Sequence, residues 1–475
     1  MSNNYDLVIL GGGMGGYVAA IRARQLGMTV AIVEKDFIGG TCLHKGCIPT
    51  KSLLKSASVF QSIVNSQKFG IETSHPILHY SEVLARKDKI INQLYQGLQT
   101  LMRRNQIEII NGYGRLLGPS IFSPMSGTIS VQYDDGRDHT VLVGKHVLLA
   151  TGTRARTLNV LPIDGDYILT SDDILALKEL PKSIVIIGGG VIGVEFASLF
   201  HDFGVDVTII EAESKLLPSF DQDLSMQLMK ELKQKGVKIL TSTKIVNQQI
   251  NHKQLVDLEI VSNEGTLSIS TEKILVAIGR SANTDDIGLD NTSIQTNDAG
   301  FITVNQYYQT KEDHIYAVGD CIGGAQLAHV AAHEGKLAVE HMAGVLEKFQ
   351  HTTFTPSCVY SQPEVATVGL TEQQAKEQNI NYKIKKLSFK SIGKALINGH
   401  SDGFIKMIIN VETNDIIGIH LIGQDVTELI AEASLAMLLD ATASEIGLNI
   451  HPHPSLSEAI QEVALAMENQ PVHTI

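Results

Sequence analysis

Short apolar runs and longer amphipathic stretches alternate along the first half of the chain. Residues 5–10 form an apolar run that predicts a buried strand of a parallel sheet. The pattern then predicts a helix over residues 14–26, closed by a glycine, and a second strand over residues 29–33. The same order of apolar run, helix and apolar run returns over residues 183–210. The chain therefore predicts two copies of a strand–helix–strand unit.

Each unit carries a glycine motif of the form G-x-G-x-x-G directly after its first strand. The motif positions are Gly11, Gly13 and Gly16 in the first unit, and Gly188, Gly190 and Gly193 in the second. The first glycine of such a motif permits a tight turn, the second lets the backbone approach a pyrophosphate, and the third lets the helix pack on the strand. The phosphates lie at the N-terminus of the helix. A glycine motif alone is weak evidence, but strand, motif, helix and strand together, twice, predict two dinucleotide sites.

An acidic residue ends the second strand of each unit. Glu34 lies 23 positions after Gly11, and Glu211 lies 23 positions after Gly188. A carboxylate at that place accepts a hydrogen bond from a ribose hydroxyl. At Glu211 it would also repel a 2′-phosphate, and residues 212–215 offer one lysine and no arginine pair. The second site is therefore predicted to bind NAD rather than NADP.

The rest of the chain predicts connections and a further domain. KHVLLATG at residues 145–152 and KILVAIGR at residues 273–280 predict strands that carry the chain across between domains. Residues 315–320 predict a strand ending in Asp320, where a carboxylate either holds a polyol hydroxyl or simply ends a turn. From residue 350 onward, strand-like and helical runs alternate without a glycine motif, which indicates an α+β domain.

Cys42 and Cys47 lie five positions apart in the segment GGTCLHKGCIPTK. A proline follows Cys47 almost at once and suits a first helical turn, so Cys47 is placed at a helix N-terminus. The helix dipole favours an anion there and makes the thiol easier to ionise. The pair could be a redox-active disulfide, a structural disulfide or half of a metal site. The metal interpretation lacks a second pair, because Cys321 and Cys358 are isolated in the sequence.

A second unusual segment, HPHPSLSE, occupies residues 451–458. Its two prolines restrict the backbone and orient the histidines. A helix that carries Glu458 is predicted to begin at Pro454 or Ser455. His453 and Glu458 fit a base and the carboxylate that orients it, although a histidine in a solvated turn is the simpler interpretation of His453 alone.

Composition narrows the classes of function. The chain has 475 residues, enough for about three domains, of which 43% are hydrophobic and 19% charged. The net charge of −13 argues against nucleic acid as the main partner. No run approaches the ~18 apolar residues of a membrane helix, and the first residues lack the pattern of a signal or transit peptide. Four cysteines with one close pair suit a reducing compartment, so a cytoplasmic location is expected.

The cysteine segment, the two glycine motifs, the strand end at Asp320 and the HPHPSLSE segment together resemble the flavin disulfide reductase family over essentially the whole chain. The resemblance implies an α/β fold with two Rossmann-type dinucleotide-binding domains, for FAD and NAD, and a C-terminal α+β dimerisation domain. It implies an FAD-binding domain at 1–149 and an NAD-binding domain at 150–279. A central segment at 280–347 would complete the FAD domain, and a dimer-interface domain would follow at 348–475.

The resemblance also implies roles for individual residues. Cys47 would be the thiolate that faces the flavin, and Cys42 the thiol that exchanges with substrate. Lys51 would lie near the flavin N5 and pair with Glu195, and Asp320 would hold the ribityl chain. The remaining residues expected to bind the cofactors are Gly114, Ala328, His329 and Gly279.

His453 would be the base, oriented by Glu458, and would act on the disulfide of the other subunit, so that activity would require a homodimer. Within the family, the chain is similar to members that reoxidise protein-bound dihydrolipoamide with NAD⁺ in 2-oxo acid dehydrogenase complexes. The implied partners are the lipoyl domains and the peripheral-subunit-binding domain of an acyltransferase, and no metal is implied. His44-Lys45 replaces a more common Asn-Val, a variant similar to members that serve branched-chain complexes.

Three other functions stay open at the level of the sequence. A glutathione or mercuric reductase usually requires NADPH, against which Glu211 argues, and mercuric reductases carry a C-terminal cysteine pair that is lacking after Cys358. An FAD-dependent NADH oxidase would need neither Cys42 nor His453. A binding subunit of a multienzyme assembly is the third, and this role can coexist with catalysis, because an acidic surface can dock a basic segment.

Overall fold

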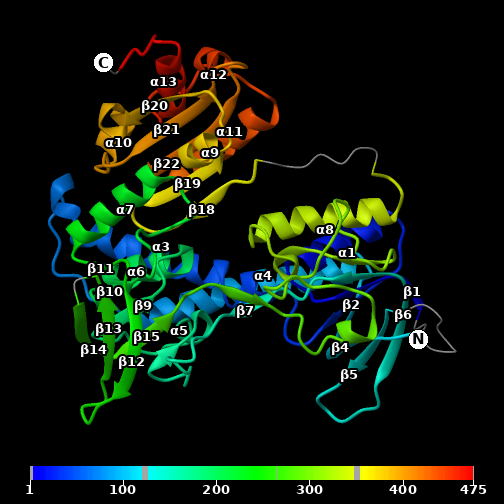
Figure 1. Ribbon diagram of the computed structural model, residues 1–475. Helices are drawn as coiled ribbons and strands as arrows, with labels where there is room; N and C mark the ends of the chain where they lie inside the picture. The colour runs from blue at the N-terminus through cyan, green and yellow to red at the C-terminus, as the bar shows by residue number, and fades with distance from the viewer. Residues whose placement is uncertain (1–3, 120–126, 264, 347–353, 474–475) are drawn as a thin grey trace. The chain divides into compact units, whose positions relative to one another are not determined.

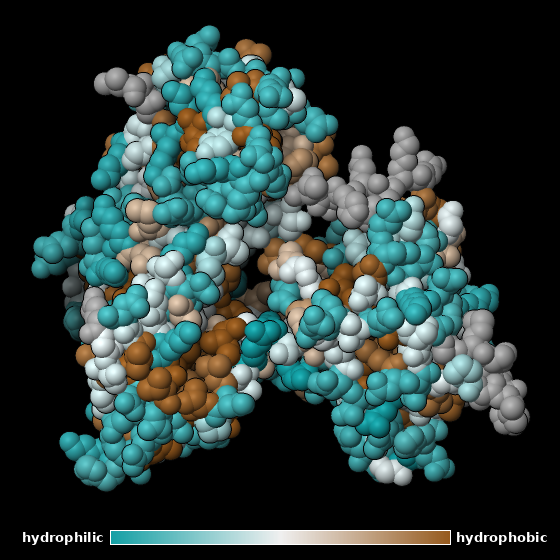
Figure 2. Space-filling view, viewed as in Figure 1, coloured by the Kyte–Doolittle hydropathy of each residue, from teal (hydrophilic) through white to brown (hydrophobic). Residues whose placement is uncertain are grey.

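A computed structural model describes residues 4–119, 127–263, 265–346 and 354–473 of the chain (Figure 1). The chain forms two compact units, each built from three separate segments. Unit 1 comprises Met1–Ser52, Leu84–Arg156 and Gly279–Gln350, and unit 2 comprises Leu53–Val83, Thr157–Ile278 and His351–Ile475. Hydrophilic residues cover much of the visible face of each unit, with apolar residues gathered in patches between them (Figure 2).

Unit 1 is built on a seven-stranded sheet with the order β3-β2-β1-β6-β5-β4, in which β17 also pairs with β6. Its strands are β1 (Asn4–Leu10), β2 (Val30–Glu34), β3 (Glu108–Asn111), β4 (Tyr113–Leu117), β5 (Thr128–Gln132), β6 (Thr140–Leu149) and β17 (Ile315–Ala317). β1, β2, β3, β6 and β17 run parallel, and β4 and β5 extend the sheet in antiparallel fashion. The central strands are apolar on both faces because both faces are buried.

Helices α1 (Met14–Gln25) and α8 (Ala328–Met342) lie side by side on this sheet (Figure 1). The buried face of α1 consists of glycines and alanines, which lets the two backbones approach closely. A Cβ added to Gly335 of α8 would lie 2.4 Å from the carbonyl oxygen of Gly15. Three further elements complete the part of unit 1 that matters for the site: α2 (Gly40–His44), the long helix α4 (Tyr80–Arg104) and the 3₁₀ turn η3 (Gly319–Ile322). A small sheet pairs β7 (Thr153–Ala155) with β16 (Arg280–Ala282).

The first part of unit 2 repeats the strand–helix–strand arrangement. Its parallel sheet has the order β11-β10-β9-β15-β8. The strands are β8 (Ile168–Leu169), β9 (Ser183–Ile187), β10 (Asp206–Ile210), β11 (Lys238–Leu240) and β15 (Lys273–Val276), and the helices are α5 (Ser171–Ile174), α6 (Val191–Asp202) and α7 (Gln222–Lys235). A meander of β12 (Lys244–Ile250), β13 (Val256–Ser262) and β14 (Gly265–Thr271) packs its apolar side chains against this sheet.

The C-terminal part of unit 2 is an antiparallel sheet with the order β18-β19-β22-β21-β20. Its strands are β18 (Ser357–Val359), β19 (Glu364–Gly369), β20 (Tyr382–Ser388), β21 (Phe404–Asn410) and β22 (Ile416–Gly423). The helices are α9 (Glu372–Glu377), α10 (Gly393–Ile397), α11 (Val426–Leu438), α12 (Ala443–Leu448) and α13 (Glu458–Met467). α11 packs against β19 and β22, and α13 packs against β20 and β21, to form one apolar core.

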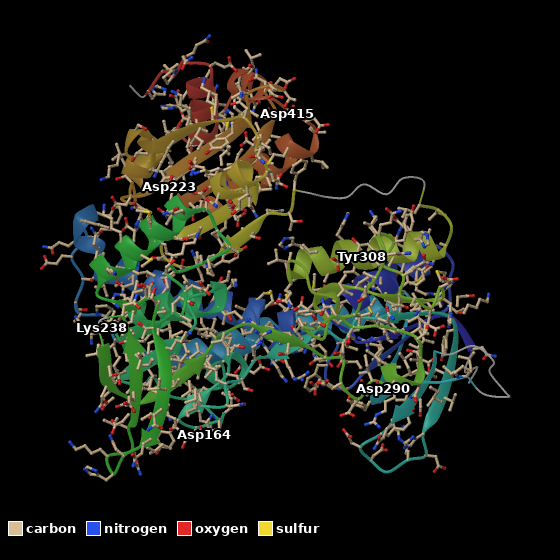
Figure 3. All side chains as sticks on the ribbon, viewed as in Figure 1. Asp164, Asp223, Lys238, Asp290, Tyr308 and Asp415 are labelled. Atoms are coloured by element: carbon tan, nitrogen blue, oxygen red, sulfur yellow. The ribbon has the colours of Figure 1, made fainter. Side chains whose placement is uncertain are left out.

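A buried lysine joins the two parts of unit 2. Lys406 of β21 is almost fully buried, and its Nζ lies 3.0 Å from Asp221 Oδ1, 3.1 Å from Asp223 Oδ2 and 2.8 Å from Glu372 Oε2. Asp221 caps the N-terminus of α7, and Asp223 is labelled in Figure 3. Burial lowers the pKa of Lys406, but the hydrogen bonds to these carboxylates outweigh it and raise the pKa above its ordinary value. The ammonium therefore stays charged, as a buried cation with carboxylate partners should.

The predicted α/β fold with two strand–helix–strand units is confirmed, and two details of the prediction are wrong. The strand predicted over residues 145–152 is the second half of a longer strand, β6. Residues 140–142 of β6 pair with β5, residues 143–149 pair with β1, and residues 147–149 also pair with β17. The C-terminal helix α13 begins at Glu458 rather than at Pro454 or Ser455. The backbone N–H of Ser455 donates to Glu458 Oε2 at 2.9 Å, so this segment forms a turn before the helix. Within the described residues, no helix combines the length and apolar character needed to span a bilayer.

Candidate active site

The first glycine turn of unit 1 joins β1 to α1. Gly11 has φ +103°, and a Cβ on Gly16 would lie 1.9 Å from the carbonyl oxygen of Gly11, so only glycine fits there. The space above Gly13 is open: a Cβ added to it would meet nothing within 4 Å. Gly13 is the N-cap of α1 and has no side-chain cap, which leaves the first N–H groups of the helix for a ligand. This cradle fits a pyrophosphate.

Glu34 at the end of β2 closes the same turn. Its Oε2 accepts a hydrogen bond from Gly12 N at 2.7 Å, and its Oε1 accepts one from Asp36 N at 2.8 Å. A carboxylate has about four acceptor positions, so two remain for ribose hydroxyls. Gly114 of β4 packs against the end of β1, because a Cβ there would lie 2.4 Å from Leu10 Cδ1. Glu34 and Gly114, which the sequence predicts to bind a cofactor, therefore both lie beside the ends of β1 and β2.

The second glycine turn, between β9 and α6 of unit 2, has nearly the same geometry. Gly188 has φ +106°, a Cβ on Gly193 would lie 1.9 Å from the Gly188 carbonyl oxygen, and the space above Gly190 is open. Glu211 Oε2 accepts from Gly189 N at 2.5 Å, and its Oε1 accepts from Glu213 N at 2.7 Å. This site also fits a dinucleotide.

The cysteine pair lies in the first segment of unit 1, between α2 and the start of the next helix. Cys42 belongs to α2, and Cys47 is the first residue of α3 (Cys47–Val64), as the position of the proline predicts. Neither of the two forms a disulfide in the structure. A hydrogen bond with Cys47 and burial raise the pKa of Cys42, Lys51 opposes that shift, and Asp320 adds to it. The fold therefore brings Cys42, Cys47, Lys51 and Asp320 within electrostatic reach of one another.

Asp320 lies on η3, directly after β17, and is held by a chain of hydrogen bonds. Thr153 Oγ1 donates to Asp320 Oδ2 at 2.8 Å, and Arg280 Nε donates to Thr153 Oγ1 at 2.7 Å. Ala328 and His329 begin α8, a few residues further along the chain. The other oxygen of the Asp320 carboxylate can accept a hydrogen bond from a hydroxyl of a ligand, and the expected contact with the ribityl chain stays a prediction.

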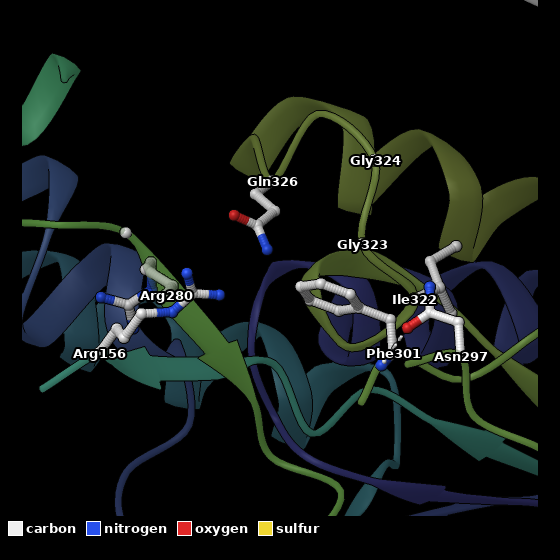
Figure 4. Close-up of a pocket in the computed structure, with 9 residues that line it drawn as sticks. Arg156, Arg280, Asn297, Phe301, Ile322, Gly323, Gly324 and Gln326 are labelled. Atoms are coloured by element: carbon white, nitrogen blue, oxygen red, sulfur yellow. Dashed lines mark hydrogen bonds between the residues drawn. The ribbon is translucent and has the colours of Figure 1, made fainter. Parts of the chain in front are cut away.

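A pocket of about 330 Å³ opens beside this turn (Figure 4). It is lined by Gly279 just before β16, by Arg280 at the start of β16, by Arg156, and by Phe301 and Gln326 on the opposite side. In Figure 4 the Gln326 side chain lies between the two arginines and the Phe301 ring. Two guanidinium groups and an amide in one pocket suit an anionic or polar part of a cofactor. Gly279 is among the residues that the sequence predicts to bind a cofactor, and the two arginines are not, because no local motif marks them.

His453 and Glu458 form a hydrogen-bonded pair in unit 2. The distance between His453 Nδ1 and Glu458 Oε1 is 2.8 Å, and the His453 side chain is 77% exposed. Burial raises the pKa of Glu458, but the hydrogen bonds from His453 and from the Ser455 N–H outweigh it and lower the pKa below its ordinary value. The carboxylate thus stays ionised and fixes the tautomer with the proton on Nδ1. Nothing in the described part of the chain hydrogen-bonds Nε2, which can accept a proton from a ligand.

A second histidine–glutamate pair lies beside it. His451 Nε2 lies 2.7 Å from Glu432 Oε1, and its Nδ1 lies 3.1 Å from the Asn449 carbonyl oxygen. The His451 side chain is only 2% exposed. Two histidines two positions apart therefore have opposite environments. The sequence does not distinguish them, because Glu432 comes from α11.

His44, which departs from the common pattern, packs between two aromatic rings. Its ring centroid lies 5.5 Å from that of Phe37 and 5.2 Å from that of Tyr95, and its Nε2 hydrogen-bonds the Ile38 carbonyl oxygen at 3.0 Å. Tyr95 comes from α4. His44 thus ties the loop after β2 and the segment between the cysteines to α4, a contact that the sequence does not predict.

The predicted residues are divided between the two units. The cysteine pair, Lys51, Asp320 and the first glycine turn belong to unit 1, and the second glycine turn, Glu195 and the His453–Glu458 pair belong to unit 2. Glu195 of α6 is nearly fully buried, and its Oε1 accepts a hydrogen bond from Tyr360 N at 3.0 Å. The expected pairing of Lys51 with Glu195 joins the two units and stays a prediction.

Comparison with known proteins places these features in a family. Residues 5–335 match the pyridine nucleotide-disulphide oxidoreductase family, and residues 355–464 match the dimerisation domain of the same family. The chain is 51% identical to a dihydrolipoyl dehydrogenase of Bacillus subtilis (strain 168), with 100% of both chains covered. It is 36% identical to a leghemoglobin reductase of Glycine max, covering 99% of this chain and 89% of the relative. The crystal structure of LpdA from Mycobacterium tuberculosis matches with a TM-score of 0.89 at 26% identity, covering 97% of this chain and 99% of that one.

Proposed function

The chain belongs to the pyridine nucleotide-disulphide oxidoreductase family, and from this premise we propose that it oxidises dihydrolipoamide with NAD⁺ through the Cys42–Cys47 pair. The cofactors of the family are FAD and NAD. The observation that carries the proposal is the full-length 51% identity to a dihydrolipoyl dehydrogenase in a chain that keeps a close cysteine pair within reach of Lys51 and Asp320. The two glycine cradles supply one site for each dinucleotide.

The cofactor sites are assigned as follows. FAD would be held by the first glycine turn, Glu34, Gly114, Lys51, Asp320, Ala328 and His329, and NAD by the second glycine turn, Glu195, Glu211 and Gly279. The fit rests on the open space above Gly13 and Gly190 and on the uncapped helix ends. The chemistry that bound FAD supplies is transfer of an electron pair from the cysteine dithiol to NAD⁺.

The residues of the chain carry the thiol chemistry. A neutral His453 accepts a proton from one thiol of dihydrolipoamide at Nε2, and Glu458 stabilises the resulting imidazolium. The substrate thiolate attacks Cys42 Sγ, the Cys42–Cys47 bond breaks, and Cys47 leaves as a thiolate. The second substrate thiol then displaces Cys42 and closes the lipoyl disulfide, while its proton passes by way of His453 to Cys42 Sγ. The cysteines are left reduced, with Cys42 as a thiol and Cys47 as a thiolate. Lys51 favours the charged form of the pair, as its effect on the pKa of Cys42 indicates.

A second copy of the chain is the partner that the C-terminal region supports. Residues 355–464 match the dimerisation domain of the family. Several apolar side chains in the segment that precedes His453 are strongly exposed, with Leu439 at 69%, Leu448 at 81% and Ile450 at 92%. We propose that a second copy covers them and that His453 acts on the cysteine pair of that copy. Lipoyl domains and the peripheral-subunit-binding domain of an acyltransferase are the further partners proposed, in the cytoplasm.

The proposed domains follow the glycine turns and the ends of the sheets. We assign an FAD-binding domain to 1–149, an NAD-binding domain to 150–279, a central segment of the FAD domain to 280–347 and a dimer-interface domain to 348–475. The first assignment is supported by the order of β1, α1 and β2, and the second by the repetition of that order in β9, α6 and β10.

The test is NADH formation from dihydrolipoamide and NAD⁺, run beside NADPH oxidation by glutathione disulfide. Activity in the first assay alone is expected. Activity in the second alone would contradict both the acceptor assigned to Glu211 and the base assigned to His453. In the matched variant Cys42→Ser, dihydrolipoamide-dependent NADH formation should be lost while NADH still reduces the bound flavin. Equal loss of both reactions would mean that Cys42 supports folding rather than thiol exchange.

A further inference from the structure

Glu334 is a carboxylic acid of α8 that reaches back to the turn carrying Asp320. Its Oε2 accepts a hydrogen bond from the backbone N–H of Gly319 at 2.7 Å. Gly319 has φ +74°, and a Cβ there would lie 3.1 Å from Ala331 Cβ, so the turn lies tightly against α8. The sequence gives no motif for Glu334, and neither the glycine turns nor the thiol chemistry uses it.

The turn is thus held at two consecutive residues from two sides. Glu334 of α8 holds the N–H of Gly319, and Thr153 of β7 holds the carboxylate of Asp320 at 2.8 Å. A side chain is fixed when the backbone that carries it and its own polar atoms are both held. Removal of either contact therefore frees Asp320 to move relative to whatever its second oxygen binds.

Burial is the main reason why the pKa of Glu334 lies near neutral pH. Burial raises the pKa of Glu334 to about 7, the Gly319 N–H opposes that shift, and the charge of Asp320 adds to it. Tyr308, labelled in Figure 3, is a second titratable group near Glu334, because the charge of Glu334 acts on it. Burial and the Glu334 charge raise the pKa of Tyr308 to about 12, so Tyr308 stays neutral. The charge of Asp320 also raises the pKa of Cys42, so Asp320 links Glu334 electrostatically to the cysteine pair.

We propose that Glu334 is a positioning residue of the flavin site, whose ionised carboxylate fixes the Gly319–Asp320 turn for the cofactor and whose protonation loosens it. The inference rests on the proposed function, in which Asp320 holds the ribityl chain of FAD. An N–H donates a stronger hydrogen bond to a carboxylate than to a neutral carboxyl group. The turn is therefore held most firmly above a pH of about 7, and the hold weakens as the pH falls through that value.

The test measures how fast FAD is released from the full-length holoenzyme at pH values between 5.5 and 8.5. The fluorescence of the free flavin reports the release. In the wild type, release should be several-fold faster at the acidic end. Glu334→Ala removes the acceptor and should accelerate release at pH 8 by roughly tenfold or more, since an unpaired buried donor costs about 1–3 kcal/mol. Glu334→Gln keeps an acceptor without the charge, so release should be close to the acidic wild-type rate and independent of pH.

Glu340 provides matched controls on the same helix. It pairs with Arg22 of α1 at 2.8 Å and does not reach the turn. Glu340→Gln and Glu340→Ala should keep the wild-type release rate and its pH profile. If Glu334→Ala releases FAD no faster than Glu340→Ala, or if Glu334→Gln keeps the wild-type pH profile, the inference is wrong. Should Glu334→Ala fail to fold, the pH profile of Glu334→Gln still decides.

This test is independent of the substrate. If the wild type binds FAD and does not oxidise dihydrolipoamide, the proposed function fails while the role of Glu334 is still measured by flavin release. If dihydrolipoamide is oxidised and flavin release from all the Glu334 variants matches the wild type, the proposed function stands and the inference fails.

Discussion

The two glycine turns of this chain have almost the same geometry, but the residues that surround them differ. In both, a Cβ on the third glycine of the motif would lie 1.9 Å from the carbonyl oxygen of the first. In both, the carboxylate at the end of the next strand accepts a hydrogen bond from the N–H of the residue after the first glycine, Gly12 or Gly189. In unit 1 the turn shares its unit with the Cys42–Cys47 pair and with Asp320, which comes from a segment far along the chain. No cysteine of the described part of unit 2 belongs to a close pair.

The comparison indicates that the motif determines which class of ligand is bound, while the surrounding residues determine which reaction the bound ligand takes part in. A turn, a helix N-terminus and a carboxylate suffice to hold a dinucleotide. Electron transfer from a thiol pair needs groups that, in the described residues, only the surroundings of the first turn supply. The repeated motif would therefore predict two equal sites, whereas the fold makes them unequal.

Substitution of the third glycine of each motif is the strongest test of the difference between the two sites. Gly16→Ala and Gly193→Ala introduce the same 1.9 Å clash with backbone, which the rigid turn cannot relieve. Gly16→Ala should yield protein without FAD and without any activity. Gly193→Ala should keep FAD and lose roughly 100-fold or more in kcat/KM for NAD⁺.

Flavin absorbance of the purified protein and NAD⁺ kinetics measure the two outcomes. Gly97→Ala on α4 is the control, because a Cβ there meets nothing within 4 Å and both activities should be unchanged. Loss of FAD in both glycine variants would mean that the two sites are not independent.

His453→Gln separates the thiol chemistry from both nucleotide sites. Glutamine cannot accept the substrate proton, so turnover of dihydrolipoamide should fall by at least ~100-fold. Reduction of the bound flavin by NADH should be unaffected, because it uses neither His453 nor Glu458. Steady-state kinetics and anaerobic stopped-flow reduction by NADH measure the two reactions, and near-normal turnover would remove His453 from the mechanism.

The carboxylates at the strand ends offer a finer comparison. Glu211→Ala removes an acceptor for ribose hydroxyls and the partner of Gly189 N–H, and should raise KM for NAD⁺ about tenfold while weakening discrimination against NADP⁺. The control is Glu213→Ala, an exposed neighbour whose side chain has no such contact. Kinetics with both nucleotides decide, and equal effects of the two substitutions would deny Glu211 a specific role.

Local signals made the two turns, both strand-end carboxylates and the helix start at Cys47 predictable from the sequence. Each of these depends on residues within about 25 positions of one another, so spacing alone carries the information. The contacts that the sequence did not predict belong to no such motif, although they span no greater distance along the sequence: Glu334 binds Gly319, 15 positions earlier, and His451 binds Glu432, 19 positions earlier. A histidine or glutamate has no periodic pattern, so its partner becomes visible only when the elements are packed.

The smallest expected effect concerns the loop between the first carboxylate and the cysteine pair, which has no counterpart in unit 2. His44 packs edge-on against Tyr95 and near Phe37, contacts worth about 0.5–1.5 kcal/mol per aromatic pair. His44→Asn should therefore lower the melting temperature by a few degrees and change dihydrolipoamide turnover by less than roughly threefold, because neither sulfur loses a direct contact.

Lys45→Val is the matched control in the same loop. Lys45 and Asp36 form an ion pair at 3.8 Å in which both side chains are more than half exposed, and such a pair contributes little to stability. Thermal unfolding of the holoenzyme should thus leave Lys45→Val at the wild-type melting temperature and His44→Asn below it. The reverse order would mean that the exposed ion pair, rather than the packing on α4, holds the loop that leads to the cysteines.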